Sequence, residues 1–164
     1  MLKLVILSAS LFGGGNEPVV DLPLKASPAD RWMSFRGSLE MTGVSLTQLP
    51  AELELLWSVK TDDSFESTAA ITNGEIYLPS IMGRCHSFDL ATGKERWKFQ
   101  SPDEDPAKSS PCVAGNAIIY GDDVGALRAL DRANGKELCT FATQAEIICS
   151  PTVVQGKLLV GAYD

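Results

Sequence analysis

The 164-residue sequence lacks the features by which several classes of functional site are recognised. It has a single histidine, His86, and its four cysteines form no Cys-x-x-Cys pair, which argues against a zinc site built from close ligand pairs. There is no Gly-x-Ser-x-Gly motif of the kind that holds a hydrolase nucleophile. Positive charge is also scarce: a net charge of -7 and the absence of a basic stripe oppose binding to nucleic acid or anionic lipid.

Long apolar runs are missing as well, and the most apolar stretch lies at the N-terminus. A lysine at position 3, the apolar run LVILSASLF and a following group of small residues predict a signal peptide over residues 1–15. The alternative is a buried first strand. The run is too short for a membrane span, and the proline-rich residues 16–30 are expected to be an extended linker. We therefore expect a periplasmic or secreted protein.

The most informative feature of the sequence is an internal repeat. SFDLATGKERWKF (87–99) returns 42 positions later as ALDRANGKELCTF (129–141). Three further segments, 67–80, 109–123 and 149–164, each place a two-residue turn candidate between short apolar runs. The unit is four short strands in about 40 residues, a period typical of one blade of a β-propeller.

The predicted fold class is therefore all-β, with β-propeller blades of four antiparallel strands. The expected organisation is a lead-in segment and outer strand at 31–61 and a partial propeller at 62–164, with blades at 62–100, 101–142 and 143–164. The last of these blades is incomplete. A closed propeller needs about four to eight blades, so we expect about two to three blades of a longer propeller. The remaining blades, or an oligomer partner, would then cover the open faces.

The repeat resembles the tryptophan-docking motif of the pyrroloquinoline-quinone-like (PQQ-like) β-propellers, Ala-x-Asp-x-x-Thr-Gly-x-x-x-Trp. In that family the tryptophan packs between adjacent blades. The motif positions here are Asp89, Gly93 and Trp97 in one copy and Asp131, Gly135 and Cys139 in the next, where a cysteine replaces the tryptophan. Trp57, 40 positions before Trp97, matches the docking tryptophan of an otherwise missing blade. RWMSFRGSLEMTGVS (31–45) resembles the segment that precedes the first blade in secreted PQQ-like repeat proteins.

The residues that could carry chemistry are expected to be structural. We expect His86 to be an exposed strand residue without a carboxylate partner, and the acids of SPDEDPAKSS (101–110) to lie in a solvated connector. Asp122 and Asp123 are expected in a hairpin turn. The cysteines Cys85, Cys112, Cys139 and Cys149 are expected to be buried free thiols, with a disulfide between Cys112 and Cys149 left open. No catalytic, cofactor-binding or metal-binding residue is predicted.

The resemblance implies two functions. The favoured one is a non-catalytic binding or scaffold module, which holds a protein or polysaccharide partner on the blade connectors 61–67, 101–109 and 142–148. The alternative is the N-terminal part of a quinoprotein (PQQ-dependent) dehydrogenase. Such enzymes enclose the quinone between a tryptophan and a disulfide of adjacent cysteines, beside Ca²⁺. This sequence has no adjacent cysteines and no recognisable calcium loop, so it supports neither PQQ nor Ca²⁺ as a cofactor.

Overall fold

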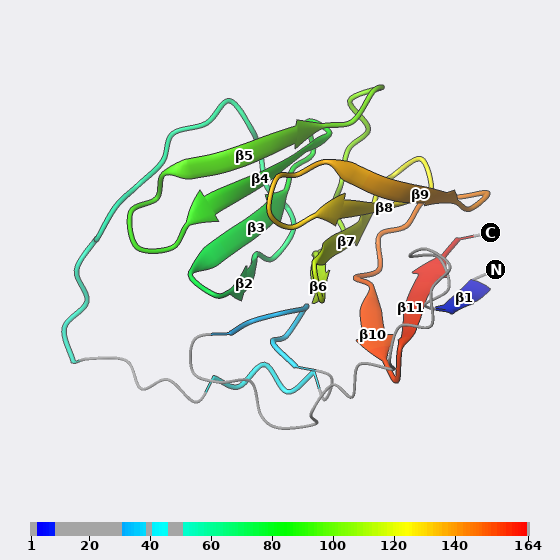
Figure 1. The fold of residues 1–164 in the computed structure, drawn as a ribbon, viewed down its shortest axis with the longest axis horizontal. Coiled ribbons are helices and arrows are strands. Elements are labelled where there is room, and N and C mark those ends of the chain that lie inside the picture. The colour runs from blue at the N-terminus through cyan, green and yellow to red at the C-terminus, as the bar shows by residue number, and fades with distance from the viewer. Residues whose placement is uncertain (1–2, 9–30, 39–40, 46–50, 164) are drawn as a thin grey trace.

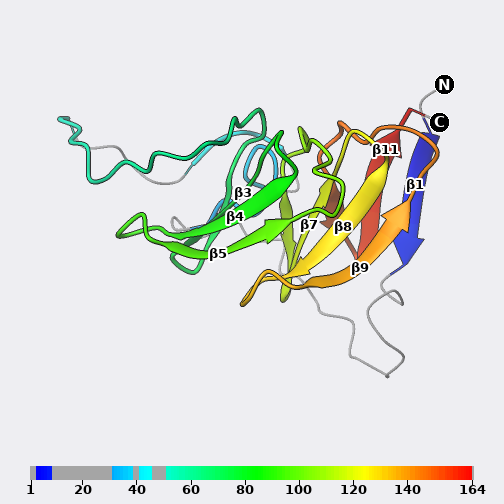
Figure 2. The same cartoon turned by 90° about the horizontal axis from the view of Figure 1, so that it is seen from above.

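The computed structural model describes residues 3–8, 31–38, 41–45 and 51–163. Within them the regular structure consists of eleven β-strands in three antiparallel sheets. Figure 2 shows the three sheets standing in a row, each turned against its neighbour. The predicted linker and most of the predicted signal peptide fall outside the described residues.

Two of the sheets are complete blades with the same topology (Figure 1). Blade 1 runs in the order β2 (Ala70–Thr72), β3 (Glu75–Pro79), β4 (Arg84–Asp89) and β5 (Glu95–Gln100). Blade 2 repeats it with β6 (Cys112–Ala114), β7 (Ala117–Gly121), β8 (Ala126–Asp131) and β9 (Glu137–Ala142). Even the irregularity between the third and fourth strands recurs, after Ser87 and after Ala129. The prediction of all-β structure with four-stranded antiparallel blades is confirmed.

The hairpins within the blades follow from local turn chemistry. Asn73 and Gly74, between β2 and β3, have φ of 52° and 72°, and Gln155 and Gly156 have φ of 50° and 68°. Two successive residues with positive φ twist the chain in the sense that adjoining strands require, and Asn and Gly tolerate that conformation. The predicted two-residue turns at these positions are present.

The third sheet combines the two ends of the chain. β10 (Thr152–Val154) and β11 (Lys157–Ala162) form the hairpin predicted for the third blade, and β1 (Lys3–Ser8) pairs with the other edge of β11. The pairing is antiparallel, from Lys3 opposite Ala162 to Ser8 opposite Lys157. β1 thus takes the place that β4 and β8 have in the complete blades (Figures 1 and 2). In the structure the N-terminal apolar run is therefore a strand, which the sequence offered as the alternative to a signal peptide.

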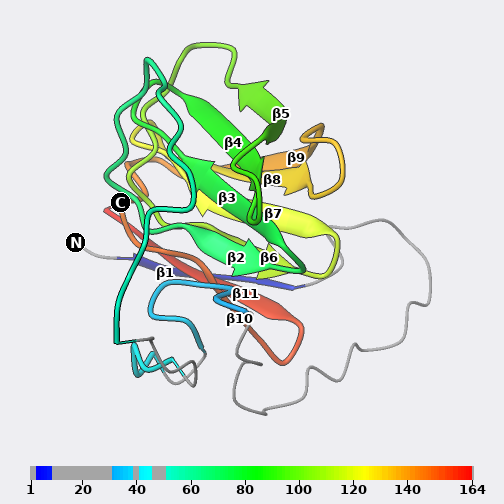
Figure 3. The same cartoon turned by 90° about the vertical axis from the view of Figure 1, so that its left-hand side faces the viewer.

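The core lies between the blades. Tyr77 and Cys85 of blade 1 pack with Ile118, Tyr120 and Leu130 of blade 2 in one buried cluster. A second cluster on the other face of blade 2 includes Ile119, Leu127, Ile147, Leu158 and Val160. Every residue of β7 is buried, because blade 2 has a neighbour on each face. In Figure 3, which looks along the row, the strands of blade 1 lie over those of blade 2.

The two described segments before blade 1 differ in how they contact the blades. Trp32 exchanges two backbone hydrogen bonds of 2.7 Å with Ile71 of β2, and Val113 of β6 donates to the carbonyl of Met33 at 2.8 Å. The lead-in segment therefore runs along the innermost strands of both complete blades. Residues 51–60 are extended and pair as a strand with no other described residue, and they expose apolar side chains at Leu53, Leu55 and Leu56.

Candidate functional site

The three predicted connectors pack against the loops that follow the second strands of the blades. Backbone hydrogen bonds join them there: Ile81 donates to Ser64, Asp123 donates to Pro106, and Ile147 donates to Asp122, at 3.1, 2.8 and 2.9 Å. Charged side chains of the three connectors also interact with one another. Lys108 of the second connector bonds Asp123 at 2.5 Å, and Asp123, then Glu66 and Glu146 from the other two connectors, raise the pKa of Lys108. The connectors therefore meet at one end of the blades.

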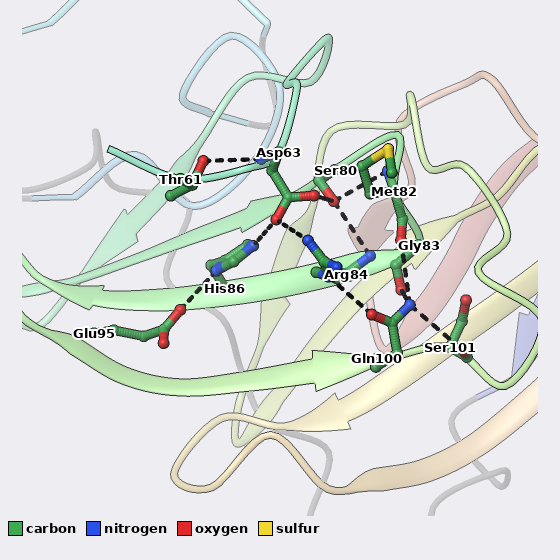
Figure 4. Close-up of polar contacts among 10 residues, drawn as sticks. All are labelled: Thr61, Asp63, Ser80, Met82, Gly83, Arg84, His86, Glu95, Gln100 and Ser101. Atoms are coloured by element: carbon green, nitrogen blue, oxygen red, sulfur yellow. Dashed lines mark hydrogen bonds and ion pairs between the residues drawn. The ribbon is translucent and has the colours of Figure 1, made fainter. Parts of the chain in front are cut away.

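His86 lies at this end of blade 1, enclosed by two carboxylates. Its Nε2 is 2.7 Å from Oδ2 of Asp63 in the first connector, and its Nδ1 is 2.7 Å from Oε1 of Glu95 in β5. The side chain is only 3% exposed. Figure 4 shows the ring in β4 between the two acids. The ring of Phe88 stacks parallel to the imidazole at 5.5 Å, and Phe65 meets it edge-on at 5.8 Å.

Asp63 is the point at which the first connector is attached to the blade. It accepts hydrogen bonds from Ser80 Oγ at 2.7 Å and from the Arg84 guanidinium at 3.1 Å, in addition to its contact with His86 (Figure 4). Burial opposes its ionisation, but the hydrogen bonds from Ser80, His86 and Arg84 outweigh burial and hold the pKa of Asp63 below its ordinary value. Asp63 is therefore a buried anion with several donors, and it keeps the connector on β4.

Arg84 extends this network to the edge of the blade. Its Nε donates to Oε1 of Gln100 at 2.9 Å, and Nε2 of Gln100 donates to the carbonyls of Met82 and Gly83 at 3.2 and 3.3 Å (Figure 4). The loop between β3 and β4 is thus bonded to both the connector and the end of β5. Such a network makes the blade end rigid.

Blade 2 carries a second cluster in which an arginine replaces the histidine. Arg128 of β8 contacts three acids: Asp105 at 2.9 Å, Asp122 at 3.1 Å and Glu137 at 3.0 Å. Its side chain is 8% exposed. Burial raises the pKa of Asp122, although hydrogen bonds from Ala126 and Arg128 act against it. A permanent cation therefore holds the second connector through Asp105.

The two clusters occupy equivalent positions of the repeat. Four pairs of residues are each separated by 42 positions: Asp63 and Asp105, Ser80 and Asp122, His86 and Arg128, and Glu95 and Glu137. In both blades the anchoring aspartate comes from the connector and the cation from the third strand. The pairs differ in the cation: a titratable imidazole in blade 1 and a guanidinium in blade 2.

The sequence-based expectations for these residues were wrong in part. His86 is buried and has two carboxylate partners, because residues distant in the sequence cover it. Asp105 is also buried, unlike the exposed Asp103 and Glu104, so the connector is only partly solvated. Asp122 does precede a turn, but it is fully buried and pairs with Arg128. The recurrence of acids at a 42-residue spacing was the available signal for the clusters.

Among the predicted motif residues, the aspartates and glycines lie at the turns between the third and fourth strands, and Trp97 and Cys139 lie within the fourth strands. Trp97 donates from Nε1 to the carbonyl of Arg132 at 2.9 Å, and a Cβ on Gly135 would lie 2.5 Å from the indole. Trp57 repeats the arrangement one blade earlier, with a 3.0 Å bond to the carbonyl of Leu90 and the same closeness to Gly93. Cys139, at the corresponding position of blade 2, is half-buried against the second core cluster.

The two motif aspartates brace the turns between the third and fourth strands. Oδ1 of Asp89 accepts hydrogen bonds from the backbone of Ala91 and from both the backbone and hydroxyl of Thr92. Oδ1 of Asp131 accepts from the backbones of Ala133 and Asn134. Asp89 also contacts Arg96 at 2.7 Å, and that hydrogen bond is the main cause that lowers the pKa of Asp89 to about 2.

The cysteines are all free thiols in the structure, but not all are buried. Cys85 and Cys112 are buried as expected, whereas Cys139 is half-buried and Cys149 is exposed. Cys149 lies before β10 rather than within a strand, so the expectation of four buried thiols was wrong for it.

The ionisable side chains of the two clusters pair with one another. Among the described residues, no group of three His, Cys, Asp or Glu side chains is arranged to hold a metal ion. The buried acids are already bonded to His86, Arg84 or Arg128. The acids that the structure describes at the blade ends therefore do not fit a calcium-bound quinone.

The row of like-built, four-stranded antiparallel sheets defines the chain as part of a β-propeller. Residues 82–164 match the family model PQQ_2, described as outer membrane protein assembly factor BamB, and the chain belongs to this family of PQQ-like propeller repeats. None of the described segments is a helix able to cross a membrane.

Proteins of two kinds are similar in sequence. Quinohemoprotein alcohol dehydrogenase ADH IIB of Pseudomonas putida is 30% identical over 98% of this chain and 26% of its own length. Outer membrane protein assembly factor BamB of Shewanella oneidensis is 27% identical over 74% of this chain and 34% of its own length. The chain thus spans about a quarter to a third of the curated relatives it matches.

Solved structures of the same two kinds share the fold. Quinohemoprotein alcohol dehydrogenase from Comamonas testosteroni gives a TM-score of 0.71 at 23% identity, covering 82% of this chain and 23% of that one. BamB from Moraxella catarrhalis gives 0.58 at 22% identity, covering 66% and 34%. At these identities the likeness concerns the fold alone.

Proposed function

We propose that the chain is part of an exported PQQ-like β-propeller that acts as a non-catalytic binding or scaffold module. Its binding face is formed by the connectors 61–67, 101–109 and 142–148, and its partner is a protein or a polysaccharide. The relatives named outer membrane protein assembly factor support a protein partner in the cell envelope. The net charge of -7 argues against a nucleic acid partner.

The observation that carries this proposal is the enclosure of His86. A general base must reach the proton that it removes, yet this histidine, the only one in the sequence, is buried between Asp63 and Glu95. The ion clusters instead fasten two connectors to rigid blade ends. Loops held on a rigid scaffold are suited to recognition, and these expose Asp62, Asp103 and Glu104 to solvent.

The open edges of the row imply a second kind of partner. Trp57 contacts blade 1 in the way that Trp97 contacts blade 2, which supports residues 55–61 as the outer strand of a further blade. We propose that the inner strands of that blade come from remaining propeller blades or from an oligomer partner. Sedimentation of the purified 164-residue chain tests this, because a monodisperse monomer would contradict it.

Site-specific photo-crosslinking tests the binding face. A photoreactive residue at Asp103, on the second connector, is expected to capture an envelope protein or a labelled envelope polysaccharide. The matched control carries the photoreactive residue in place of Lys136, in the exposed turn at the far end of blade 2. Equal capture from both positions, or capture from Lys136 alone, would contradict a connector face.

The alternative, part of a quinoprotein dehydrogenase, is favoured by the 30% identity to the Pseudomonas putida enzyme over nearly the whole chain. It is tested with the longest natural form of the protein, supplied with PQQ, Ca²⁺, a panel of alcohols and an electron-acceptor dye. Dye reduction above the quinone-free control would overturn the non-catalytic proposal. The binding module predicts none.

Export is tested through the N-terminus of the mature protein. The sequence predicts removal of residues 1–15 as a signal peptide, whereas β1 uses Lys3–Ser8 as a strand of the third sheet. Cell fractionation with intact-mass measurement separates the two. A mature periplasmic chain without residues 1–15 supports export by cleavage, and a full-length cytoplasmic chain contradicts export.

A further inference from the structure

The anchoring aspartates of the two connectors contact side chains of different chemistry at equivalent positions of the third strands. Asp63 of the first connector bonds His86, and Asp105 of the second bonds Arg128, at equivalent positions of the repeat. A guanidinium keeps its charge at every pH relevant to a cell, whereas an imidazole is the side chain that changes charge between about pH 5 and 8. The second connector therefore provides an internal reference for the first.

The contacts of His86 require a particular protonation state. Both ring nitrogens face carboxylate oxygens at 2.7 Å, and an ionised carboxylate can only accept a hydrogen bond. A neutral imidazole carries one N–H, so it can donate to Asp63 or to Glu95 but not to both. Only the imidazolium ion makes both bonds and joins the connector to β5.

We propose that His86 is a proton-dependent bridge between the first connector and blade 1. With both nitrogens protonated, it links Asp63 to Glu95 and holds residues 61–67 firmly. When it loses one proton, one bond opens, the other loses its charge assistance, and the connector opens more often. The second connector, held by Arg128, does not respond. This bridge is internal to the chain and does not depend on which partner the connectors bind.

The surroundings indicate which bond opens. Asp63 is 1% exposed and keeps Ser80 and Arg84 as donors, so it stays ionised, and only the charge assistance of its bond to His86 is lost. The Glu95 side chain is 42% exposed, and water can solvate it when it turns away. On the adjoining strands the positions opposite His86 are Leu78 in β3 and Lys98 in β5, neither of which is an acid. The neutral ring therefore keeps Nε2–H on Asp63 and releases Glu95.

Two equivalent amides report on the two connectors. Ile81 N–H donates to the first connector at Ser64, and Asp123 N–H donates to the second at Pro106. Hydrogen exchange of the full chain, followed by NMR and corrected for intrinsic rates, is measured between about pH 6 and pH 8. Because a charge-assisted bond is roughly twice as strong as a neutral one, protection of Ile81 is expected to fall about five- to tenfold as pH rises. Protection of Asp123 is expected to stay constant.

The sole histidine makes the titration directly visible. The ring ¹⁵N signals belong to His86 alone, and their midpoint must coincide with the midpoint of the Ile81 change. His86→Arg copies blade 2 and is expected to remove the pH response of Ile81. Glu95→Gln, whose amide can accept from or donate to Nδ1, is expected to reduce the response without changing the fold.

A fall in protection that is equal at Ile81 and Asp123 would overturn the proposal, because it would reflect a general loosening of the chain. So would a response of Ile81 that persists in His86→Arg, or one whose midpoint differs from that of the His86 ring. Should His86→Arg fail to fold, Glu95→Gln and the comparison of the two amides in the unmodified chain still decide the matter.

Discussion

Trp97 of blade 1 is bonded to the turn of blade 2 through its indole Nε1, which donates to the carbonyl of Arg132 at 2.9 Å. The ring lies against Gly135, where φ is 73° and no side chain intervenes. Trp57 and Leu90 repeat the relationship at 3.0 Å. The Trp97 side chain thus spans the boundary between blades 1 and 2 and supplies both apolar contact and a hydrogen bond, and Trp57 makes the same contacts to the turn of blade 1.

Gly135→Ala is expected to destabilise the chain by more than its backbone cost. A left-handed alanine costs about 1–2 kcal/mol, and here the new Cβ would also lie 2.5 Å from Trp97. Gly74→Ala is the matched control, since its φ of 72° is almost the same but nothing lies within 4 Å of its Cβ. Urea unfolding should show a larger loss for Gly135→Ala, and equal losses would mean that the indole does not press on the turn.

Trp97→Ala is expected to lower the free energy of unfolding by about 3 kcal/mol, the lower end of the range for a buried tryptophan. The side chain is only partly buried, but the bond to Arg132 is lost with it. Cys139→Ala, at the equivalent position of blade 2, removes one sulfur atom and is expected to cost less than about 1 kcal/mol. Similar losses for both variants would contradict the docking role of Trp97.

Arg128→Met is expected to destabilise the chain by about 3–5 kcal/mol at neutral pH, because it leaves buried carboxylates without their cation. Burial already raises the pKa of Asp122, and removal of Arg128 raises it further. Protonation of the buried acids then removes their unpaired charge and stabilises the folded variant. The deficit should therefore shrink as pH falls from about 7 to about 5. Denaturant unfolding of both proteins at several pH values measures it, and a pH-independent deficit would contradict the cluster.

Asp63→Asn is expected to reduce the acid sensitivity of the fold. Despite burial, hydrogen bonds from Ser80, His86 and Arg84 hold the pKa of Asp63 below its ordinary value. The stability from its ionised form is thus present above about pH 4 and is lost as pH falls through the lower folded value. The variant should be less stable at neutral pH but lose less on acidification. The melting temperatures of both proteins are measured between about pH 2.5 and 6. If Asp63 were not involved, the two plots of melting temperature against pH would run parallel.

The exposed and the fully buried thiols are expected to react at different rates. Cys149 is exposed and should react first with a thiol reagent in the native chain. Burial raises the pKa of Cys112 to about 11 and raises that of Cys85 further, which leaves little thiolate at either. In denaturant without reductant, four thiols per chain are expected. A count of two would instead support the disulfide between Cys112 and Cys149 that the sequence left open.

The sequence predicted the blades well because their information is local. The Asn73-Gly74 turn, the alternation in β5 and the 42-residue spacing all concern residues near one another in the chain or copies of one unit. It failed at His86, whose partners Asp63 and Glu95 lie 23 and 9 positions away in other segments. A single histidine between Cys85 and Ser87 carries no local sign of what covers it. The same holds for Asp122, which the sequence placed in a turn without its arginine.

The repeating unit, the strand alternation and the tight turns follow from the amino-acid order, since backbone preferences and period-two patterns act over a few residues. The charge pairs and the pairing of distant strands follow only from the three-dimensional fold. It brought Asp63 to His86 and Asp105 to Arg128, and it placed Lys3–Ser8 beside Lys157–Ala162. Such pairings depend on which loops and strands fold onto the same blade end, and a buried charge is stable only where folding supplies its partner.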